Sequence, residues 1–177
     1  MKRTWVPVFF IIGAALLGGC GKASKNGPSG DSNAAADSLI PTKAQPKLAT
    51  IKLWIGPEEM STEMAVTEVQ ERTGMMFRTN MAENEGMIFV FPMPQRADFW
   101  MMNTILPLSA AYIDPDGQIV EIHDLQPHDT NSVRAATDNI QYVLETRQGW
   151  FKRHNIKEGT VIATERGTLR KTFSGDK

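Results

Sequence analysis

The side chains with the chemistry to bind or transform a ligand fall into three groups, and the first is polar and aromatic. It combines two guanidinium groups, an indole, an amide, a hydroxyl and a carboxylate. Arginine offers forked donors that suit a carboxylate or a phosphate, and asparagine both donates and accepts hydrogen bonds. If these groups converge on one cleft, they predict a site for a small polar ligand. The candidate ligand-binding residues are Arg72, Arg78, Trp100, Asn103, Thr104 and Glu145.

The same residues have a structural interpretation. Arg72 or Arg78 could pair with Glu145 and lock a helix to a sheet. Asn103 and Thr104 could then satisfy a tight turn. Buried polar networks often serve the fold in this way. The sequence alone leaves both interpretations open.

The second group is a segment with two histidines and two aspartates within seven residues: His123, Asp124, His128 and Asp129. Imidazoles and carboxylates can bind zinc or another transition metal, and they can act as acid–base groups. However, Pro127 interrupts the segment, which indicates a strand end that runs into a loop. Histidine and aspartate are common in solvated loops, so we expect no metal site here.

The third group contains sulfur and tryptophan. Seven of the ten methionines lie between residues 75 and 102. Thioethers favour Cu(I), so copper binding is one interpretation, and gap filling in a small core is the interpretation that we favour. Trp100 and Trp150 could form a sugar-stacking platform or close the core. In a strand, Met102 lies on the face opposite to Met101, where it can line a surface or a pocket.

Signatures of nucleophilic and nucleotide-dependent catalysis are missing. The sequence has no GxSxG pattern, no phosphate-binding loop and no dinucleotide fingerprint. The one cysteine, Cys20, excludes an internal disulfide framework and a cysteine-based zinc site. We therefore expect a non-catalytic module without a cofactor. The alternative is an envelope hydrolase that uses Glu145 or the His123/His128 segment, and a further alternative is methionine-based copper binding.

Length and charge restrict the class of protein. The chain has 177 residues, of which 41% are hydrophobic and 22% are charged, and its formal net charge is −1. This length suits one ordinary domain, and this composition is typical of globular proteins. Because the basic excess typical of nucleic-acid-binding proteins is missing, we expect no nucleic-acid partner.

The N-terminus has the pattern of a secretory signal. Lys2 and Arg3 precede an apolar run from residue 6 to residue 17, and Leu-Gly-Gly-Cys follows. The run is too short to span a bilayer, which needs about 20 residues. Small residues before Cys20 resemble the bacterial lipobox, in which the thiol carries diacylglycerol, and Gly21 resembles the outer-membrane class. We therefore expect an envelope lipoprotein that is anchored through Cys20 and faces the periplasm at the outer membrane.

Composition divides the rest of the chain. Residues 21–47 are rich in glycine, serine, alanine, asparagine, proline and lysine and contain no aromatic residue, which is typical of a flexible segment. The predicted domains are a signal peptide at 1–19, the lipidated cysteine and a tether at 20–47, a folded domain at 48–173 and a disordered tail at 174–177.

Apolar alternation within the folded domain, together with one continuous apolar run at 87–91 that is typical of a covered strand, predicts many short strands. Thr67 is a helix cap with Gln70 at the capping-box position, Gly74 ends that helix, and residues 149–154 suggest further helical turns. The fold class is therefore mainly β, a sandwich or barrel with about two short helices. The predicted strands are 51–55, 60–66, 87–91, 98–103, 108–113, 118–122, 140–145 and 161–164.

Four motifs occur in an order that resembles a known family. They are ERTGMMFR at 71–78, GMIFVF at 86–91, FWMMNT at 99–104 with Pro107-Leu108 behind it, and YVLE at 142–145 followed by Gly149-Trp150. Together they resemble the DUF192 family over residues 50 to about 164. This resemblance implies a compact, mainly β, jelly-roll-like domain and supplies no activity or cofactor. Met102 stands where the family usually has lysine.

From these observations we expect an uncharacterised lipoprotein, anchored to the membrane by lipid on Cys20. Its domain is expected to bind a small polar ligand or an envelope protein without turnover.

Overall fold

The computed structural model describes residues 40–174. The predicted signal peptide, Cys20, residues 20–39 of the predicted tether and residues 175–177 of the predicted tail lie outside this range. Residues 40–174 form ten strands and three helices: β1 Thr50–Ile55, β2 Glu58–Ala65, α2 Glu68–Thr73, β3 Glu85–Gln95, β4 Asp98–Phe99, β5 Leu108–Ile113, β6 Ile119–Leu125, β7 Val133–Arg134, β8 Ile140–Arg147, α3 Trp150–Arg153, β9 Ile162–Thr164, β10 Gly167–Thr168 and α4 Leu169–Phe173.

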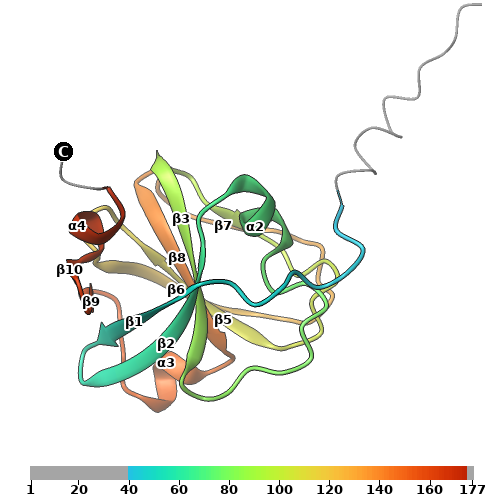
Figure 1. Ribbon diagram of the computed structural model, residues 1–177, viewed down its shortest axis with the longest axis horizontal. Helices are drawn as coiled ribbons and strands as arrows, with labels where there is room; N and C mark the ends of the chain where they lie inside the picture. The colour runs from blue at the N-terminus through green and yellow to red at the C-terminus, as the bar shows by residue number, and fades with distance from the viewer. Residues whose placement is uncertain (1–39, 175–177) are drawn as a thin grey trace, which may run out of the picture.

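Eight of these strands form one large sheet in the order β10-β9-β1-β2-β3-β8-β5-β6, and β4 pairs with β7 in a small second sheet. Neighbouring strands are antiparallel except β2 and β3, which run parallel because α2 and the segment after it carry the chain back across the sheet. The mainly β, sandwich-like fold expected from the sequence is confirmed. The strands fan out in Figure 1, with α4 and α2 on different sides of the domain.

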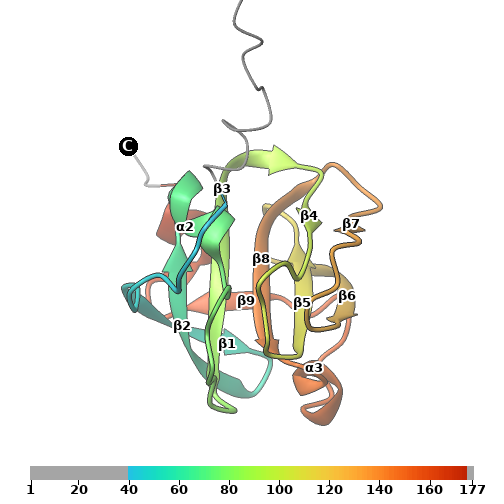
Figure 2. The same cartoon turned by 90° about the vertical axis from the view of Figure 1, so that its right-hand side faces the viewer.

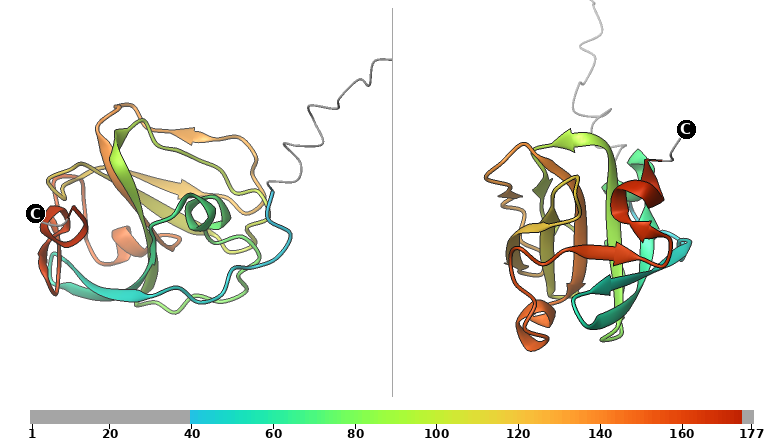
Figure 3. Two further views of the ribbon diagram at one scale, coloured as in Figure 1. Left: turned by 45° about the horizontal axis from the view of Figure 1, so that its top comes forward. Right: turned by 90° about the vertical axis from the view of Figure 1, so that its left-hand side faces the viewer.

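The large sheet curls, because hydrogen bonds link its two ends. The Ile119 amide donates to the Thr160 carbonyl at 2.9 Å, and the Ile162 amide donates to the Gly117 carbonyl at 2.8 Å. Figure 3 shows the sheet wrapped around its interior. Side-chain alternation along each strand then produces two hydrophobic clusters, one on each face of the sheet.

The inner cluster lies inside the curl and includes Leu53, Ile88, Leu144 and Trp150. The outer cluster lies on the other face and includes Met87, Phe89, Tyr112 and Val143. The two sets alternate along β3 and β8, as expected for strands that are covered on both faces. Figure 2 shows β4 and β7 over this outer side, beside β5 and β6.

Most sequence-predicted elements are confirmed. The β1–β2 hairpin turns at Gly56, whose φ is 59°. The Thr67 side chain accepts a hydrogen bond from the Gln70 amide, and the Gln70 side chain accepts one from the Thr67 amide, so the capping box is present. The Asp-Pro-Asp-Gly turn joins β5 to β6. Local chemistry decides each of these features, which is why the sequence predicts them.

Two strand predictions were wrong. The strand predicted over 98–103 ends at Phe99, because the chain then turns and Asn103 adopts a φ of 55°. The sheet does not end at residue 164, since β10 adds a further edge strand. A third short helix, α4, follows, and its first turn is capped by the Thr168 side chain, which accepts from the Lys171 amide at 3.2 Å.

Residues just before β1 contact the domain. The Gln45 amide nitrogen donates to the Gly74 carbonyl at 2.9 Å and to the Gln70 carbonyl at 3.2 Å. Arg78 donates to the Pro46 carbonyl at 3.2 Å. These bonds hold the last part of the predicted tether against the end of α2. Within the described range, no helix has the length and apolar character needed to cross a membrane.

Candidate functional site

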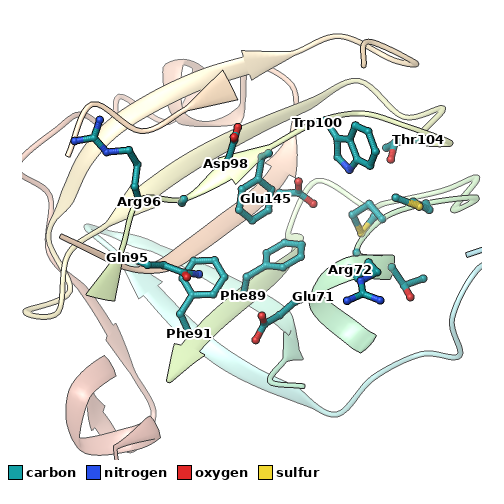
Figure 4. A pocket seen from close by; sticks show the side chains of 16 residues that line it. Glu71, Arg72, Phe89, Phe91, Gln95, Arg96, Asp98, Trp100, Thr104 and Glu145 are labelled. Atoms are coloured by element: carbon teal, nitrogen blue, oxygen red, sulfur yellow. The ribbon is translucent and has the colours of Figure 1, made fainter. Parts of the chain in front are cut away.

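A pocket of about 330 Å³ opens on the outer face of the sheet, between α2 and the segment that contains β4. Its size falls at the lower end of the range for small-molecule sites. Figure 4 shows the side chains that line it. They are Glu71, Arg72, Thr73, Gly74, Met75, Met76, Phe89, Phe91, Gln95, Arg96, Ala97, Asp98, Phe99, Trp100, Thr104 and Glu145.

Glu145 is the most unusual of these residues. Glu145 is only 4% exposed, and its Oε2 atom has no hydrogen-bond partner among the described residues. Burial raises the pKa of this carboxyl from 4.5 to about 8, because removal from water disfavours the charged form. At neutral pH the folded protein therefore holds a protonated carboxyl in the pocket, able both to donate and to accept a hydrogen bond.

The sheet explains why Glu145 lacks a partner. In the strand ladder it lies between Met87 of β3 and Ala110 of β5, whose side chains share its face. Both neighbours are apolar and fully buried. Neither arginine of the sequence-predicted pairs reaches it, since Arg72 binds Glu68 at 2.5 Å and Arg78 binds Glu63 at 2.9 Å. Of the two interpretations that the sequence left open, the structural one, in which Arg72 or Arg78 pairs with Glu145, is therefore wrong.

The walls of the pocket are largely aromatic. Phe89 and Phe99 meet edge to face with ring centroids 4.9 Å apart. Phe91 and the 43%-exposed Trp100 also line the pocket. In the view of Figure 4, Glu145 lies among the labelled side chains, with Trp100 and Thr104 to one side and Phe89 and Glu71 below it. A polar group in this pocket would meet one buried carboxyl within apolar surroundings.

Charged side chains stand nearer the mouth of the pocket. α2 supplies Glu71 and Arg72, and the segment around β4 supplies Arg96 and Asp98. Partial burial, with a smaller contribution from Glu68, raises the pKa of Glu71 above its usual value. With Glu145, the lining holds three carboxyl groups and two guanidinium groups.

The structure brings four of the six predicted ligand-binding residues to this one pocket: Arg72, Trp100, Thr104 and Glu145. Arg78 and Asn103 are outside the lining. Arg78 instead joins Glu63 of β2 to the segment before β1. The Asn103 carbonyl accepts the Phe77 amide at 2.8 Å, so Asn103 serves the turn that closes the outer cluster. Met102, predicted to line a pocket, is also outside it.

The three histidines do not form one site. His123 lies 2.9 Å from Glu121, and its ring packs on Tyr112 with centroids 5.1 Å apart. His128 lies in the loop after β6, and His154 stacks on Trp150 beyond β8. Among residues 40–174, no group of three or more histidine, cysteine, aspartate or glutamate side chains is arranged to hold a metal ion.

Five of the seven methionines between residues 75 and 102 are buried, as is the second tryptophan, whereas Met93 is 67% exposed. Met75, Met81, Met87 and Met101 belong to the outer cluster, where they fill space around Phe89. Trp150 is 2% exposed in the inner cluster, so it cannot form a stacking platform with Trp100. Trp100 lines the pocket without it.

Sequence reasoning missed three of the five charged side chains that line the pocket. Glu71, Arg96 and Asp98 were not singled out, and neither were the phenylalanines that line it. A signal was present, since Glu71 is adjacent to Arg72 and Asp98 immediately precedes the FWMMNT motif. Their convergence depends on the crossover from β2 to β3, which the sequence does not reveal.

Comparisons with known proteins find a family and two solved structures that match about two thirds of the chain. The DUF192 family model, described as an uncharacterized ACR, matches residues 51–164. A crystal structure of a "putative transcription regulator" from Sinorhizobium meliloti is 30% identical, with a TM-score of 0.63, and the match covers 68% of this chain and 98% of that one. A protein of unknown function from Novosphingobium aromaticivorans is 31% identical, with a TM-score of 0.63 and coverage of 67% and 89%. A comparison with curated protein sequences finds no relative.

Proposed function

Because the chain belongs to the DUF192 family, which is described without an activity, we propose a function from the pocket itself: a non-catalytic module that binds a small polar ligand. The observation that carries this proposal is the buried carboxyl of Glu145, which lines the pocket and has one oxygen without a hydrogen-bond partner in the described part of the chain. A buried polar group without a partner costs stability. A ligand that supplies the missing hydrogen bond would offset that cost.

The rest of the lining supports binding of a small molecule. Aromatic walls supply apolar contact area, and polar groups at the mouth can fix the orientation of a ligand. Trp100 is the residue best placed to contact a ligand that enters, since it lines the pocket and is still 43% exposed. A protein partner that inserts one polar side chain into the pocket is the alternative occupant.

We place this module in the bacterial cell envelope, anchored through lipid on Cys20. The support is the sequence pattern of a charged start, a short apolar run and Leu-Gly-Gly-Cys. Replacement of Cys20 by serine removes the acceptor thiol, so we expect Cys20→Ser to move the protein from the membrane fraction to the soluble fraction. A Cys20→Ser protein that stays in the membrane fraction would refute the lipid anchor.

The charge of this chain argues against the DNA binding that a transcription regulator needs. Removal of residues 1–19 leaves 17 basic and 20 acidic side chains, a net charge of −3. A nucleic-acid-binding domain usually neutralises phosphates with a basic excess. We therefore expect no DNA binding at physiological salt.

A thermal-shift screen of the purified chain tests the binding proposal. A ligand that binds only the folded state raises the melting temperature by mass action. The screen should include sugars, carboxylates, amines, nucleotides and metal ions, Cu(I) among them. We expect one class to stabilise the protein, and Trp100→Ala to weaken that effect while Glu59→Gln, an exposed control outside the lining, preserves it. No shift with any class would refute a small-molecule site and direct the search to protein partners.

One observation favours a second candidate, a hydrolase. A carboxyl with its pKa raised to about 8 carries a proton at neutral pH and so can act as a general acid. Glu71 and Asp98 line the same pocket and could activate water. A panel of chromogenic glycosides and esters separates the two candidates. A hydrolase would turn one of them over and lose activity in Glu145→Gln, whereas a binding module turns over none.

A further inference from the structure

The pocket also carries information on the charge of its ligand, which deepens the proposed function and rests on it. Glu145 lies between Met87 and Ala110 in the ladder, so no neighbouring strand offers it a donor. An anionic ligand could approach only while this carboxyl stays protonated. A ligand that brings its own positive charge and N–H donors allows the carboxyl to ionise and form a charge-assisted pair.

The charges around Glu145 favour a cation. The lining contains three carboxyl groups and two guanidinium groups, and one of the latter, Arg72, already pairs with Glu68 at 2.5 Å. The lining thus carries more negative than positive charge once Glu145 ionises. In addition, the faces of Phe89, Phe91 and Trp100 can attract a cation through their ring quadrupoles.

From these contacts we propose that the pocket binds a small organic cation with N–H donors, a primary ammonium or a guanidinium, with Glu145 as its buried counter-ion. The aromatic walls enclose the apolar part of such a ligand. The ligand charge replaces the missing partner of Glu145, which the fold itself does not supply.

This arrangement predicts proton release on binding. The free protein holds Glu145 protonated at neutral pH, and the complex holds it ionised, so affinity rises with pH until the free carboxyl is itself ionised. Other ionisable groups face this region. Glu71 and Arg72 on α2, Arg96 before β4 and Asp98 on β4 line the pocket. Tyr112 on β5 is close enough to feel the charge of Glu145, and Glu121 and His123 on β6 lie beside Tyr112. Of these, His123 lies 2.9 Å from Glu121, outside the lining.

Three probes of nearly the same shape test the ligand class: benzylamine, benzyl alcohol and benzoate. We would titrate each into the full chain and follow binding by calorimetry or by NMR at pH 6, 7 and 8. We expect benzylamine to bind best, with an affinity that rises about tenfold from pH 6 to pH 7, since one pH unit changes the ionised fraction by that factor. Glu145→Gln should remove this binding while the variant remains folded. Glu59→Gln, on the exposed part of β2, should leave it unchanged.

The outcomes separate the ligand class from the proposed function. Tighter binding of benzoate or benzyl alcohol, or a benzylamine affinity that falls with pH, would overturn the cationic ligand and leave a small-ligand pocket in place. Absence of binding by all three probes would overturn the cationic ligand, whereas the small-ligand pocket itself fails only if the broader thermal-shift screen also finds no ligand. Binding of benzylamine that persists in Glu145→Gln but is lost in Trp100→Ala would retain the pocket and reject Glu145 as the counter-ion.

Discussion

Replacement of Glu145 by glutamine should make the protein more stable, and the gain should depend on pH. The folded-state pKa of this carboxyl is raised from 4.5 to about 8. Between these values the unfolded chain has lost the proton and the folded chain keeps it. Stability therefore falls by about 1.4 kcal/mol for each pH unit in this window. Glutamine has a similar shape and never ionises, so it avoids this loss.

The size of the effect follows from the width of the window. At pH 4.5 the two proteins should have nearly equal stability, because glutamate is protonated in the folded state and half-protonated in the unfolded state. At pH 7 the penalty on the native protein reaches about 3 kcal/mol. For a domain of this size such a difference raises the melting temperature by roughly 10 °C. Above pH 8 the gain should stop growing, since Glu145 is then ionised in both the folded and the unfolded state of the unsubstituted protein.

Urea unfolding of both proteins at a series of pH values measures this difference directly. Glu63→Gln is the matched control, because Glu63 faces the same side of the sheet, one strand beyond Met87. Its carboxylate has partners, Arg78 at 2.9 Å and the Leu48 amide at 2.7 Å, so its replacement should destabilise the protein at pH 7. A Glu145→Gln gain that is absent, or that is the same at pH 4.5 and pH 7, would refute the claim that burial keeps Glu145 protonated.

Three further changes test the scaffold that holds the pocket. Arg78→Ala leaves the mostly buried carboxylate of Glu63 without its cation, so urea unfolding should show a loss of about 2 kcal/mol; a loss near zero would mean that solvent compensates the pair. Gly117→Ala should cost about 1–3 kcal/mol, because φ is +85° there and a Cβ would lie 3.0 Å from the Ile162 carbonyl oxygen; an unchanged melting temperature would contradict the close contact between the sheet ends. Thr67→Ala removes the cap of α2 and should cost about 1 kcal/mol in the same assay, whereas Thr67→Ser should restore most of it; equal stability of the two variants would argue against the cap.

Sequence reasoning succeeded where one segment contains all the relevant information. The capping box of Thr67 and Gln70, the turn before β6 and the continuous apolar run of β3 each depend on residues a few positions apart. Alternation also predicted that Trp100 and Met101 face opposite sides, and Met101 is indeed buried while Trp100 is 43% exposed. Four motifs in order also placed the chain in its family before any fold was known.

The same reasoning failed where a role depends on long-range packing. An ion pair between Glu145 and Arg72 or Arg78 was plausible from the sequence, because these motif residues carry opposite charges. Their actual neighbours come from the fold: Glu68 lies one helical turn from Arg72, and Glu63 comes from β2.

What the sequence by itself determined is the β-rich domain, its strand-forming segments, its helix cap and the residue types available for a site. Only the tertiary structure decided that Glu145 is a buried carboxyl whose Oε2 atom has no hydrogen-bond partner within residues 40–174. Its surroundings are set by the order of β3, β8 and β5 in the sheet and by the parallel crossover that lays α2 over the outer face. These contacts join residues far apart in the chain, so the desolvation that raises the pKa of Glu145 exists only after folding.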